Sequence, residues 1–314
     1  MDSLVTVCIT TYNRMDLLPK TLRSILDQTY KNIEVIIVDD CSTDGTEELI
    51  LTSLLKQDSR IRYIPHKKNK GLASARNTAI NNAKGKYFTF CDDDDIWDKS
   101  FVEIFASEAL NYESNWCFCC GYKLKKSGKV LCVSPNKMEM LLKRAIIEGY
   151  TPPVAGQFYN TSILQEIGGY NHNIKSGVDH DLWLSLSYIN TNILFIDKCL
   201  VSPGFAGETN RMTTDFEKRI NGIGNSLSVW RDDIVRNYGN NFYVHFCNEY
   251  KYYLFKRFVK NNLNIFKSNH VGKRFLFKNK GYFVRIFSEL IKNKINTYIN
   301  HEVRFSPLFR KKNI

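Results

Sequence analysis

The sequence predicts an α/β fold in which helices flank a mostly parallel sheet, followed by a basic, mainly helical C-terminal region. Apolar, β-prone runs alternate with helical stretches through the first hundred residues, a rhythm that favours βαβ units. These strand segments are almost uniformly apolar and carry their polar residues at their ends. The positive charge, by contrast, is concentrated near the end of the chain.

The first half alternates four predicted strands with helices. The strands are expected at residues 4–10, 33–40, 61–66 and 86–90. The spacing of leucine and isoleucine predicts a helix over residues 14–28, and a cap at Ser42, Thr43 or Asp44 begins another. The small-residue stretch 71–85 predicts a helix that Gly85 ends.

The second half is less regular, and no internal repeat is visible. We expect helices at residues 101–110, 138–149, 161–171 and 179–189. A hairpin over residues 116–133 would turn at Ser127 and Gly128, and a strand at 192–197 precedes a glycine-rich loop at 202–215.

Length and composition indicate a globular protein of one large domain with an appendage. The chain has 314 residues, 43% of them hydrophobic and 24% charged. We expect a main domain over residues 1–215, with halves at 1–100 and 101–215, and a second region over 216–314. The first residues lack the pattern of a signal peptide, and the apolar runs are far shorter than the ~20 residues of a membrane span.

The net charge of +12 lies in the tail. Residues 251–314 hold 16 lysines and arginines against two acids, whereas the remainder holds 28 basic and 30 acidic residues. This asymmetry predicts an anionic partner for the C-terminal segment.

The chain has nine cysteines, and none shows the paired spacing of a zinc site. Three of them, Cys117, Cys119 and Cys120, lie in the apolar run "WCFCCGY". We expect the cysteines to be small core residues kept reduced in a cytoplasm.

Polar clusters follow three of the predicted strands: "TTYN" at 10–13, "DDCSTD" at 39–44 and "DDDD" at 92–95. Parallel sheets bind ligands beyond the carboxyl ends of their strands. The three clusters therefore predict a ligand site at one edge of the sheet.

The run Asp92–Asp95 suits a hard divalent cation, Mg²⁺ or Mn²⁺. Alternate residues leave a strand on the same side, so Asp92 and Asp94 would face the site together. Asp93 and Asp95 would face elsewhere or cap the segment that follows. The alternative is a solvated acidic turn with a helix cap.

The segments "VTVCITTYNR", "IEVIIVDDCSTDGT" and "NKGLASARNTAINNAKGKYFTFCDDDD" resemble, in order, the N-terminal half of family 2 glycosyltransferases, which have the GT-A fold. A second block, "FYNTSILQEIGGYNHNIKSGVDHDLWLSLS" (158–187), resembles the acceptor side of that family. Together the two blocks cover roughly two-thirds of the chain.

The resemblance implies a nucleotide-sugar site. Thr10, Thr11, Tyr12 and Asn13 would line the nucleotide, and Asp40, with Asp39, would accept a hydrogen bond from the uracil edge. Arg76 would face the nucleotide or diphosphate, unless it pairs with a nearby aspartate. The DxD motif of the family corresponds to Asp92–Asp94, with Asp94 as the direct metal ligand and Asp92 or Asp93 on the ribose. A fourth aspartate, Asp95, leaves the register open by one residue.

The resemblance also implies an inverting displacement with a carboxylate base. "GVDHDLWLSL" places Asp179 in the base position, with Val178 where the family usually has an acid. Asp181 is the alternative base, or else a helix cap. Arg211 falls where a loop would cover the diphosphate, unless it is an ordinary exposed arginine.

The basic, aromatic tail predicts a helical appendage on the inner membrane surface or, alternatively, a helical subdomain with its own core. The expected protein is thus cytoplasmic and peripheral at the inner face of the cell membrane. The family resemblance, together with this tail, implies transfer of a hexose, glucose or galactose, from a UDP-sugar to a sugar on a polyprenyl diphosphate, in bacterial O-antigen or capsule synthesis. A rival hypothesis is a nucleic-acid-binding protein that uses the tail. It explains the charge but gives the acidic clusters no purpose.

Overall fold

The computed structural model describes residues 3–126, 129–135, 138–142, 156–174, 177–204, 228, 230–241, 243–244, 247–248 and 309–313. It divides into two compact units. The first comprises Met1–Arg211 and Pro307–Ile314, and the second comprises Met212–Ser306. Among the described helices, none has both the length and the apolar character that a bilayer span requires.

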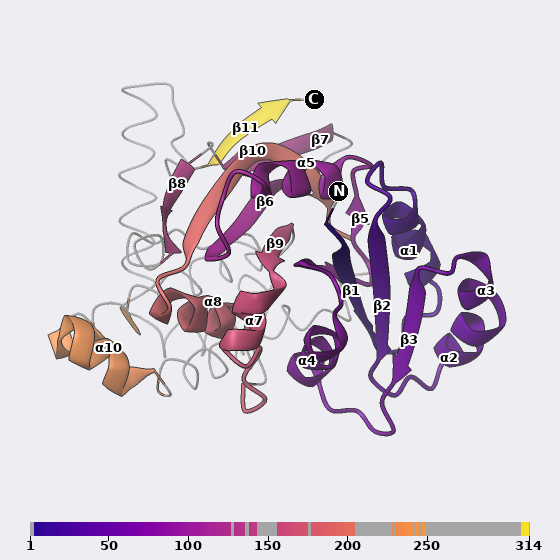
Figure 1. Ribbon diagram of the computed structural model, residues 1–314, viewed down its shortest axis with the longest axis horizontal. Coiled ribbons are helices and arrows are strands. Elements are labelled where there is room, and N and C mark those ends of the chain that lie inside the picture. The colour runs from indigo at the N-terminus through magenta and orange to yellow at the C-terminus, as the bar shows by residue number, and fades with distance from the viewer. Residues whose placement is uncertain are drawn as a thin grey trace, which may run out of the picture. The chain divides into compact units, whose positions relative to one another are not determined.

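Four parallel strands form one half of the sheet in the first unit (Figure 1). They are β1 (Val5–Thr11), β2 (Ile33–Asp39), β3 (Ile61–Pro65) and β4 (Tyr87–Asp92). Their spatial order is β4-β1-β2-β3, with Val5 opposite both Ile33 and Tyr87. These are the four strands that the sequence predicts, and their carboxyl ends meet at one edge.

Beyond β4 the sheet curls and becomes mixed. β9 (Gln157–Asn160) pairs antiparallel with β4, and it also pairs antiparallel with β6 (Trp116–Lys126), which forms a hairpin with β7 (Lys129–Pro135). The long strand β10 (Asn192–Ser202) runs parallel to β6, and its far end pairs with the two-residue β5 (Ile96–Trp97). The predicted α/β class is confirmed. The sequence did not predict β5 or β9.

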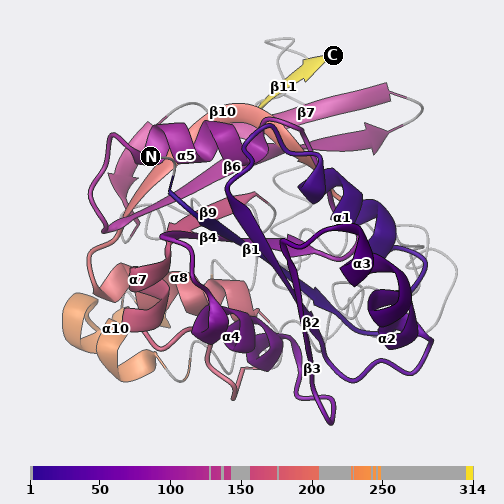
Figure 2. The same ribbon diagram turned by 45° about the vertical axis from the view of Figure 1, so that its right-hand side comes forward.

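Helices cover both faces of the sheet over two separate cores (Figure 2). One core joins the sheet to α1 (Leu18–Leu26), η1 (Ile50–Leu54) and α5 (Phe101–Ala109). The short helices α2 (Thr46–Leu49) and α3 (Leu55–Gln57) flank η1. The other core joins the sheet to α4 (Leu72–Asn82), α7 (Thr161–Glu166) and α8 (Val178–Tyr188).

One predicted helix is wrong at its start. Residues 138–149 were expected to be helical, but Met138–Leu141 is a strand, β8, antiparallel to β10. Half-buried methionines alternate there with the exposed Glu139 and Leu141, which is the period of a strand rather than of a helix. Residues 143–149 lie outside the described part of the chain.

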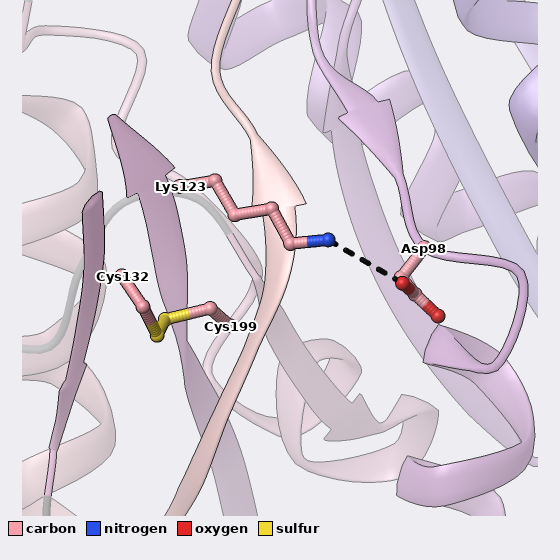
Figure 3. Close-up of a disulfide and its surroundings, with 4 residues drawn as sticks. All are labelled: Asp98, Lys123, Cys132 and Cys199. Atoms are coloured by element: carbon pink, nitrogen blue, oxygen red, sulfur yellow. Dashed lines mark hydrogen bonds and ion pairs between the residues drawn. A yellow bond between two sulfur atoms is a disulfide. The ribbon is translucent and has the colours of Figure 1, made fainter. Parts of the chain in front are cut away.

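The expectation that every cysteine is a free thiol is also wrong. Cys132 of β7 and Cys199 of β10 form a disulfide, with Cα atoms 5.8 Å apart (Figure 3). Cys199 lies where the register between β10 and β6 shifts, an irregularity that sequence spacing does not reveal. The other seven cysteines are free, and burial raises the pKa values of Cys8, Cys91, Cys117, Cys119 and Cys120.

The C-terminal residues return to the first unit. Phe309–Asn313 forms β11, an edge strand antiparallel to β7, within a region expected to be mainly helical. In the second unit, the structure describes α10 (Arg231–Tyr238), which ends at Gly239 with φ of +84°. The predicted boundary at residue 215 lies outside the described residues and remains a prediction.

We expect reduction of the Cys132–Cys199 bond to destabilise the protein. The cross-link spans 67 residues of sequence, and closing a loop of that length constrains the unfolded chain by about 4 kcal/mol. Dithiothreitol should therefore lower the melting temperature by several degrees. A Cys132→Ser variant should melt at the reduced protein's temperature whether or not reductant is present. A wild type that melts unchanged in reductant would contradict the role of this bond.

Candidate active site

The acidic run forms a tight turn at the end of β4. The Asp95 N–H donates to the carbonyl of Asp92 across 3.0 Å, which closes the turn. From α1, the Thr21 hydroxyl donates to the carbonyl of Asp93 across 2.9 Å. The Asp92 side chain is 43% exposed, whereas Asp95 is buried. The turn therefore presents carboxylates at the edge where the parallel strands end.

Arg76 joins this turn to the acceptor-side block. Its guanidinium donates from one nitrogen to Asp92 Oδ1 at 2.9 Å and from the other to Asp179 Oδ1 at 2.6 Å. The nitrogen that donates to Asp179 also donates to the Tyr170 hydroxyl at 3.1 Å. Arg76 comes from α4 and Asp179 from α8, so residues 103 apart in the sequence meet in one cluster.

The Arg76 side chain is only 4% exposed, yet it remains charged. Burial alone would lower its pKa, but the carboxylates of Asp179 and Asp92 outweigh burial and hold the pKa well above its ordinary value. The guanidinium also lies over the rings of Phe90 and Tyr170, 5.1 and 5.3 Å from their centroids. Arg76 thus pairs with two aspartates in this structure, and its predicted position facing the nucleotide or diphosphate remains a prediction.

Of the two candidate bases, Asp179 is the more accessible. It lies in the first turn of α8, after Gly177 with φ of +78°, and its side chain is 14% exposed. Asp181 is fully buried in the same helix. Val178, which stands where an acid is usual, packs into the apolar core that α4, α7 and α8 share. The valine thus contributes packing, while Asp179 keeps its carboxylate at the site.

Asp40 lies at the amino end of α4. Its carboxylate accepts hydrogen bonds from the backbone N–H groups of Lys70 and Gly71, and its Oδ1 lies 2.7 Å from His66 Nδ1. The other ring nitrogen of His66 lies 2.9 Å from the Thr78 hydroxyl. Asp40 is 5% exposed. It therefore fixes the loop that leads into α4, and its predicted contact to uracil remains a prediction.

Asp39 is buried in the same way. Its Oδ1 accepts from the backbone N–H and the hydroxyl of Ser42, and its Oδ2 accepts from the Tyr63 hydroxyl at 3.1 Å. Cys41, two residues further on, has φ of +70°, a conformation that a β-carbon makes costly. Asp39 therefore holds a strained turn in place at the edge of the candidate site.

The segment after β1 is tied to this turn. Asn13, with φ of +53°, donates its N–H to the Ser42 hydroxyl and accepts the Thr43 N–H through its side chain. Tyr12 is exposed beside it, and Thr10 is half-buried. Thr11 lies beside Asp93, and its buried hydroxyl makes no normal hydrogen bond among the described residues. The four residues thus lie at the edge where the parallel strands end, and their predicted contact with a nucleotide remains a prediction.

The neighbouring carboxylates of the acidic turn act on one another. Burial, with a further contribution from the charge of Asp92, raises the pKa of Asp93 to about 7. A divalent cation at the turn would relieve that crowding, and one or two carboxylates suffice for Mg²⁺ when water and phosphate complete its shell. The described residues contain no ready-made cluster of three metal-binding side chains. A cation at this turn remains a prediction.

Three neighbouring residues were missed by the sequence interpretation. The positive charge of Arg14 favours the ionised form of Asp93. His66 links Asp40 to α4, and the Tyr170 hydroxyl donates to Asp179. His66 directly follows β3, so the rule that polar strand ends gather at one edge would have found it. Arg14 and Tyr170 carry no such signal. Arg211, predicted to cover the diphosphate, lies outside the described residues.

Comparison with known proteins decides the family. The model for glycosyl transferase family 2 matches residues 6–156, which include the acidic turn and Arg76. The chain belongs to glycosyltransferase family 2. An uncharacterized glycosyltransferase of Rickettsia felis is 34% identical over 86% of this chain and 45% of its own length. The chain thus spans less than half the length of this relative.

A second relative has a more specific name. It is the UDP-Glc:alpha-D-GlcNAc-diphosphoundecaprenol beta-1,3-glucosyltransferase WfaP of Escherichia coli, 50% identical over 30% of this chain and 36% of its own. Other relatives of this family 2 chain include the putative colanic acid biosynthesis glycosyl transferase WcaA of Escherichia coli, 31% identical over 59% of the chain and 66% of its own.

Solved structures agree on the GT-A fold. S. aureus TarS 1–349 in complex with UDP-GlcNAc superposes with a TM-score of 0.61 over 92% of this chain and 80% of its own, at 19% identity. The mannosyltransferase PcManGT from Pyrobaculum calidifontis, in complex with GDP-Man and Mn2+, gives a TM-score of 0.59 over 90% and 83%, at 16% identity. At these identities the likeness concerns the fold.

We expect Arg76→Met to cost about 3 kcal/mol of unfolding free energy. The substitution keeps the volume of the side chain but leaves Asp179, which is mostly buried, without its cation. Urea unfolding measures the loss. The matched control is Arg60→Met, because Arg60 pairs with Asp58 where both side chains are partly exposed, and its loss should cost about 1 kcal/mol. Equal losses in the two variants would contradict a special role for Arg76.

We also expect Asp93 to contribute a loss of stability to the metal-free protein as the pH rises. Folding raises the pKa of Asp93 from its ordinary 3.8 to about 7, so the folded state binds more protons between these values. The unfolding free energy should therefore decrease as the pH rises from about 4 to about 7. Asp93→Asn should remove that part of the decrease in a series of urea titrations. Identical pH profiles for the variant and the wild type would contradict the raised pKa.

Proposed function

We propose that this family 2 chain is an inverting glycosyltransferase that uses a UDP-sugar, a divalent cation and Asp179 as base. It moves a hexose to a sugar on a polyprenyl diphosphate and forms a β-linkage in bacterial O-antigen or capsule synthesis. The observation that carries the proposal is the double ion pair of Arg76 with Asp92 and Asp179. It brings the carboxylates of the donor edge and the acceptor side into one cluster.

The donor would occupy the edge where β1, β2 and β4 end. Thr10, Thr11, Tyr12 and Asn13 offer hydroxyl, amide and aromatic groups there, as a nucleoside requires. Asp39 and Asp40 keep the predicted role at the uracil edge, and their buried hydrogen bonds already fix the loops around it. The TarS structure in complex with UDP-GlcNAc supports a donor of this class through its shared fold.

Asp94, with Asp92, would hold Mg²⁺ or Mn²⁺, and Asp92 or Asp93 would contact the ribose. When bound, the cation supplies charge neutralisation for the departing nucleoside diphosphate. Arg76 is the fixed positive charge beside this position, and Arg211 is proposed as a second one. Arg211 follows Gly204 by seven residues, a stretch that spans at most ~25 Å when extended.

Asp179 would accept the proton of the acceptor hydroxyl as that oxygen attacks the anomeric carbon and the bond to the diphosphate breaks. Its Oδ1 accepts hydrogen bonds from Arg76 and, at 3.4 Å, from Tyr170. These contacts orient the carboxylate and leave Oδ2 as the oxygen for the acceptor. Asp181, being fully buried, is the weaker choice.

The hexose and the acceptor are proposed from the relatives. WfaP is named for UDP-Glc and a GlcNAc-diphosphoundecaprenol, which supports glucose, with galactose as the close alternative, and a lipid-linked acceptor. The basic residues of 251–314 would then bind the anionic inner face of the cell membrane, where such an acceptor is presented. The enzyme would then lie in the cytoplasm, peripheral at the inner face of the cell membrane.

The test is a transfer assay with a panel of UDP-hexoses, Mn²⁺ and a GlcNAc-diphosphate-lipid analogue. We expect transfer by the wild type, loss of transfer in excess EDTA, and recovery on adding Mn²⁺. Asp179→Asn should lower the rate by 10²–10⁴-fold, the usual contribution of a general base, while UDP still binds. Glu166→Gln, an exposed carboxylate on α7, is the matched control and should transfer normally.

Undiminished transfer by Asp179→Asn would remove that residue from the base role, and transfer unaffected by EDTA would remove the metal. A binding measurement separates the rival hypothesis. UDP with Mn²⁺ should raise the melting temperature and single-stranded DNA should not. The reverse result would favour a nucleic-acid-binding protein.

A further inference from the structure

The end of β10 lies against the acidic turn. Val201 and Ser202 of β10 pair antiparallel with Trp97 and Ile96 of β5, directly after the turn. The Asp98 N–H donates to the Leu200 carbonyl across 2.8 Å, which extends the same ladder. The turn is therefore fastened to a strand that follows it by about a hundred residues in the sequence.

Gly204, two residues beyond β10, lies directly against Asp94 and Asp95 of the acidic turn. Its N–H donates to Asp95 Oδ1 across 3.1 Å, and Asp95 is only 6% exposed. A β-carbon on Gly204 would lie 1.8 Å from the Asp94 carbonyl oxygen, far inside van der Waals contact. The backbone of Gly204 does not adopt a left-handed conformation, so the requirement for glycine is one of space.

This contact divides the four aspartates into two groups. The Asp95 carboxylate accepts from the protein backbone and is buried, whereas Asp92 is open to solvent at the ligand edge. The backbone of the turn is held at Asp93 by the Thr21 hydroxyl, and at Asp94 its carbonyl occupies the space that a β-carbon on residue 204 would need. Because the carbonyl and the side chain of Asp94 are attached to the same stretch of backbone, a shift of the carbonyl would also move the side chain.

We infer that Gly204 and Asp95 are positioning residues that set the acidic turn for donor binding, and that Asp95 is not a metal ligand. The inference rests on the proposed function, because it assigns Asp94 and Asp92 to the cation of the donor. It resolves the register of the acidic run from the structure: the Asp95 carboxylate builds the turn and its predecessors face the donor. It also assigns residues 200–204 a supporting role at the donor site, which no motif in their sequence predicts.

The test compares two pairs of variants by their binding of Mn²⁺, followed by electron paramagnetic resonance, and of UDP in the presence of Mn²⁺, followed by calorimetry. Gly204→Ala pushes the Asp94 backbone away and should weaken Mn²⁺-dependent UDP binding at least tenfold. Its matched control is Gly85→Ala, whose β-carbon would lie 2.6 Å from the backbone nitrogen of Thr6, away from the turn. Gly85→Ala should lower the melting temperature but leave binding within twofold of wild type.

The second pair does not depend on a backbone clash. Asp95→Asn keeps an oxygen that accepts from the Gly204 N–H, so binding should stay within about threefold of wild type. Asp95→Ala removes that oxygen and should weaken binding at least tenfold. A ligand carboxylate would behave differently, because the amide of Asp95→Asn would lose most of the Mn²⁺ affinity.

Wild-type binding by Gly204→Ala would overturn the inference, and so would a loss in Asp95→Asn equal to that in Asp95→Ala. Both results leave the proposed function intact, since the wild type still binds. A wild type that binds neither Mn²⁺ nor UDP would overturn the proposed function and, with it, this inference. A tenfold loss confined to Gly204→Ala and Asp95→Ala would support it.

Discussion

The candidate site depends on one buried guanidinium group, that of Arg76. Arg76 lies among apolar rings and would be costly there without counter-charges, since an isolated buried charge loses several kcal/mol of hydration. Asp92 and Asp179 provide those counter-charges from two different parts of the chain. Neither carboxylate can move far without leaving one guanidinium nitrogen unpaired. The positions of the donor edge and of the candidate base are therefore mutually dependent.

The two apolar cores explain why this dependence is rigid. Arg76 lies on α4 and Asp179 on α8, and both helices pack into the same core on one face of the sheet. Asp92 ends β4, whose alternate residues enter both cores. Since close-packed interiors resist small displacements, the helices hold the two ends of the Arg76 bridge as firmly as the hydrogen bonds do. The packing that forms the fold is thus also what places the carboxylates.

The sequence was most informative where a local rule applied. The four parallel strands and the polar residues at their ends follow from apolar runs and from the geometry of parallel sheets. Where non-local contacts decide, those rules were insufficient. Residues 138–141 pair with the edge of β10, and Cys132 meets Cys199 across an irregular register. Neither the strand nor the disulfide can be predicted from a short stretch of sequence, because each depends on a distant segment.

The same contrast holds within the site. The resemblance identified Arg76 and Asp179 separately, but only the folded chain shows that one ion-pairs with the other. Asp39 and Asp40 were recognised as polar strand-end residues, yet their engagement with Ser42, Tyr63 and His66 depends on which loops lie beside them. Gly204 is the clearest case, because its importance lies in the space next to another residue's carbonyl.

The pairing of β11 with β7 changes how the basic region is attached. Met212–Ser306 is bounded on both sides by segments of the first unit, so it is an insertion rather than a free tail. A chain cut after Arg211 would lose an edge strand of the sheet together with that region, and would uncover the hydrogen-bonding groups of β7. Separating the two units cleanly therefore requires an internal deletion that rejoins residue 211 to residue 307.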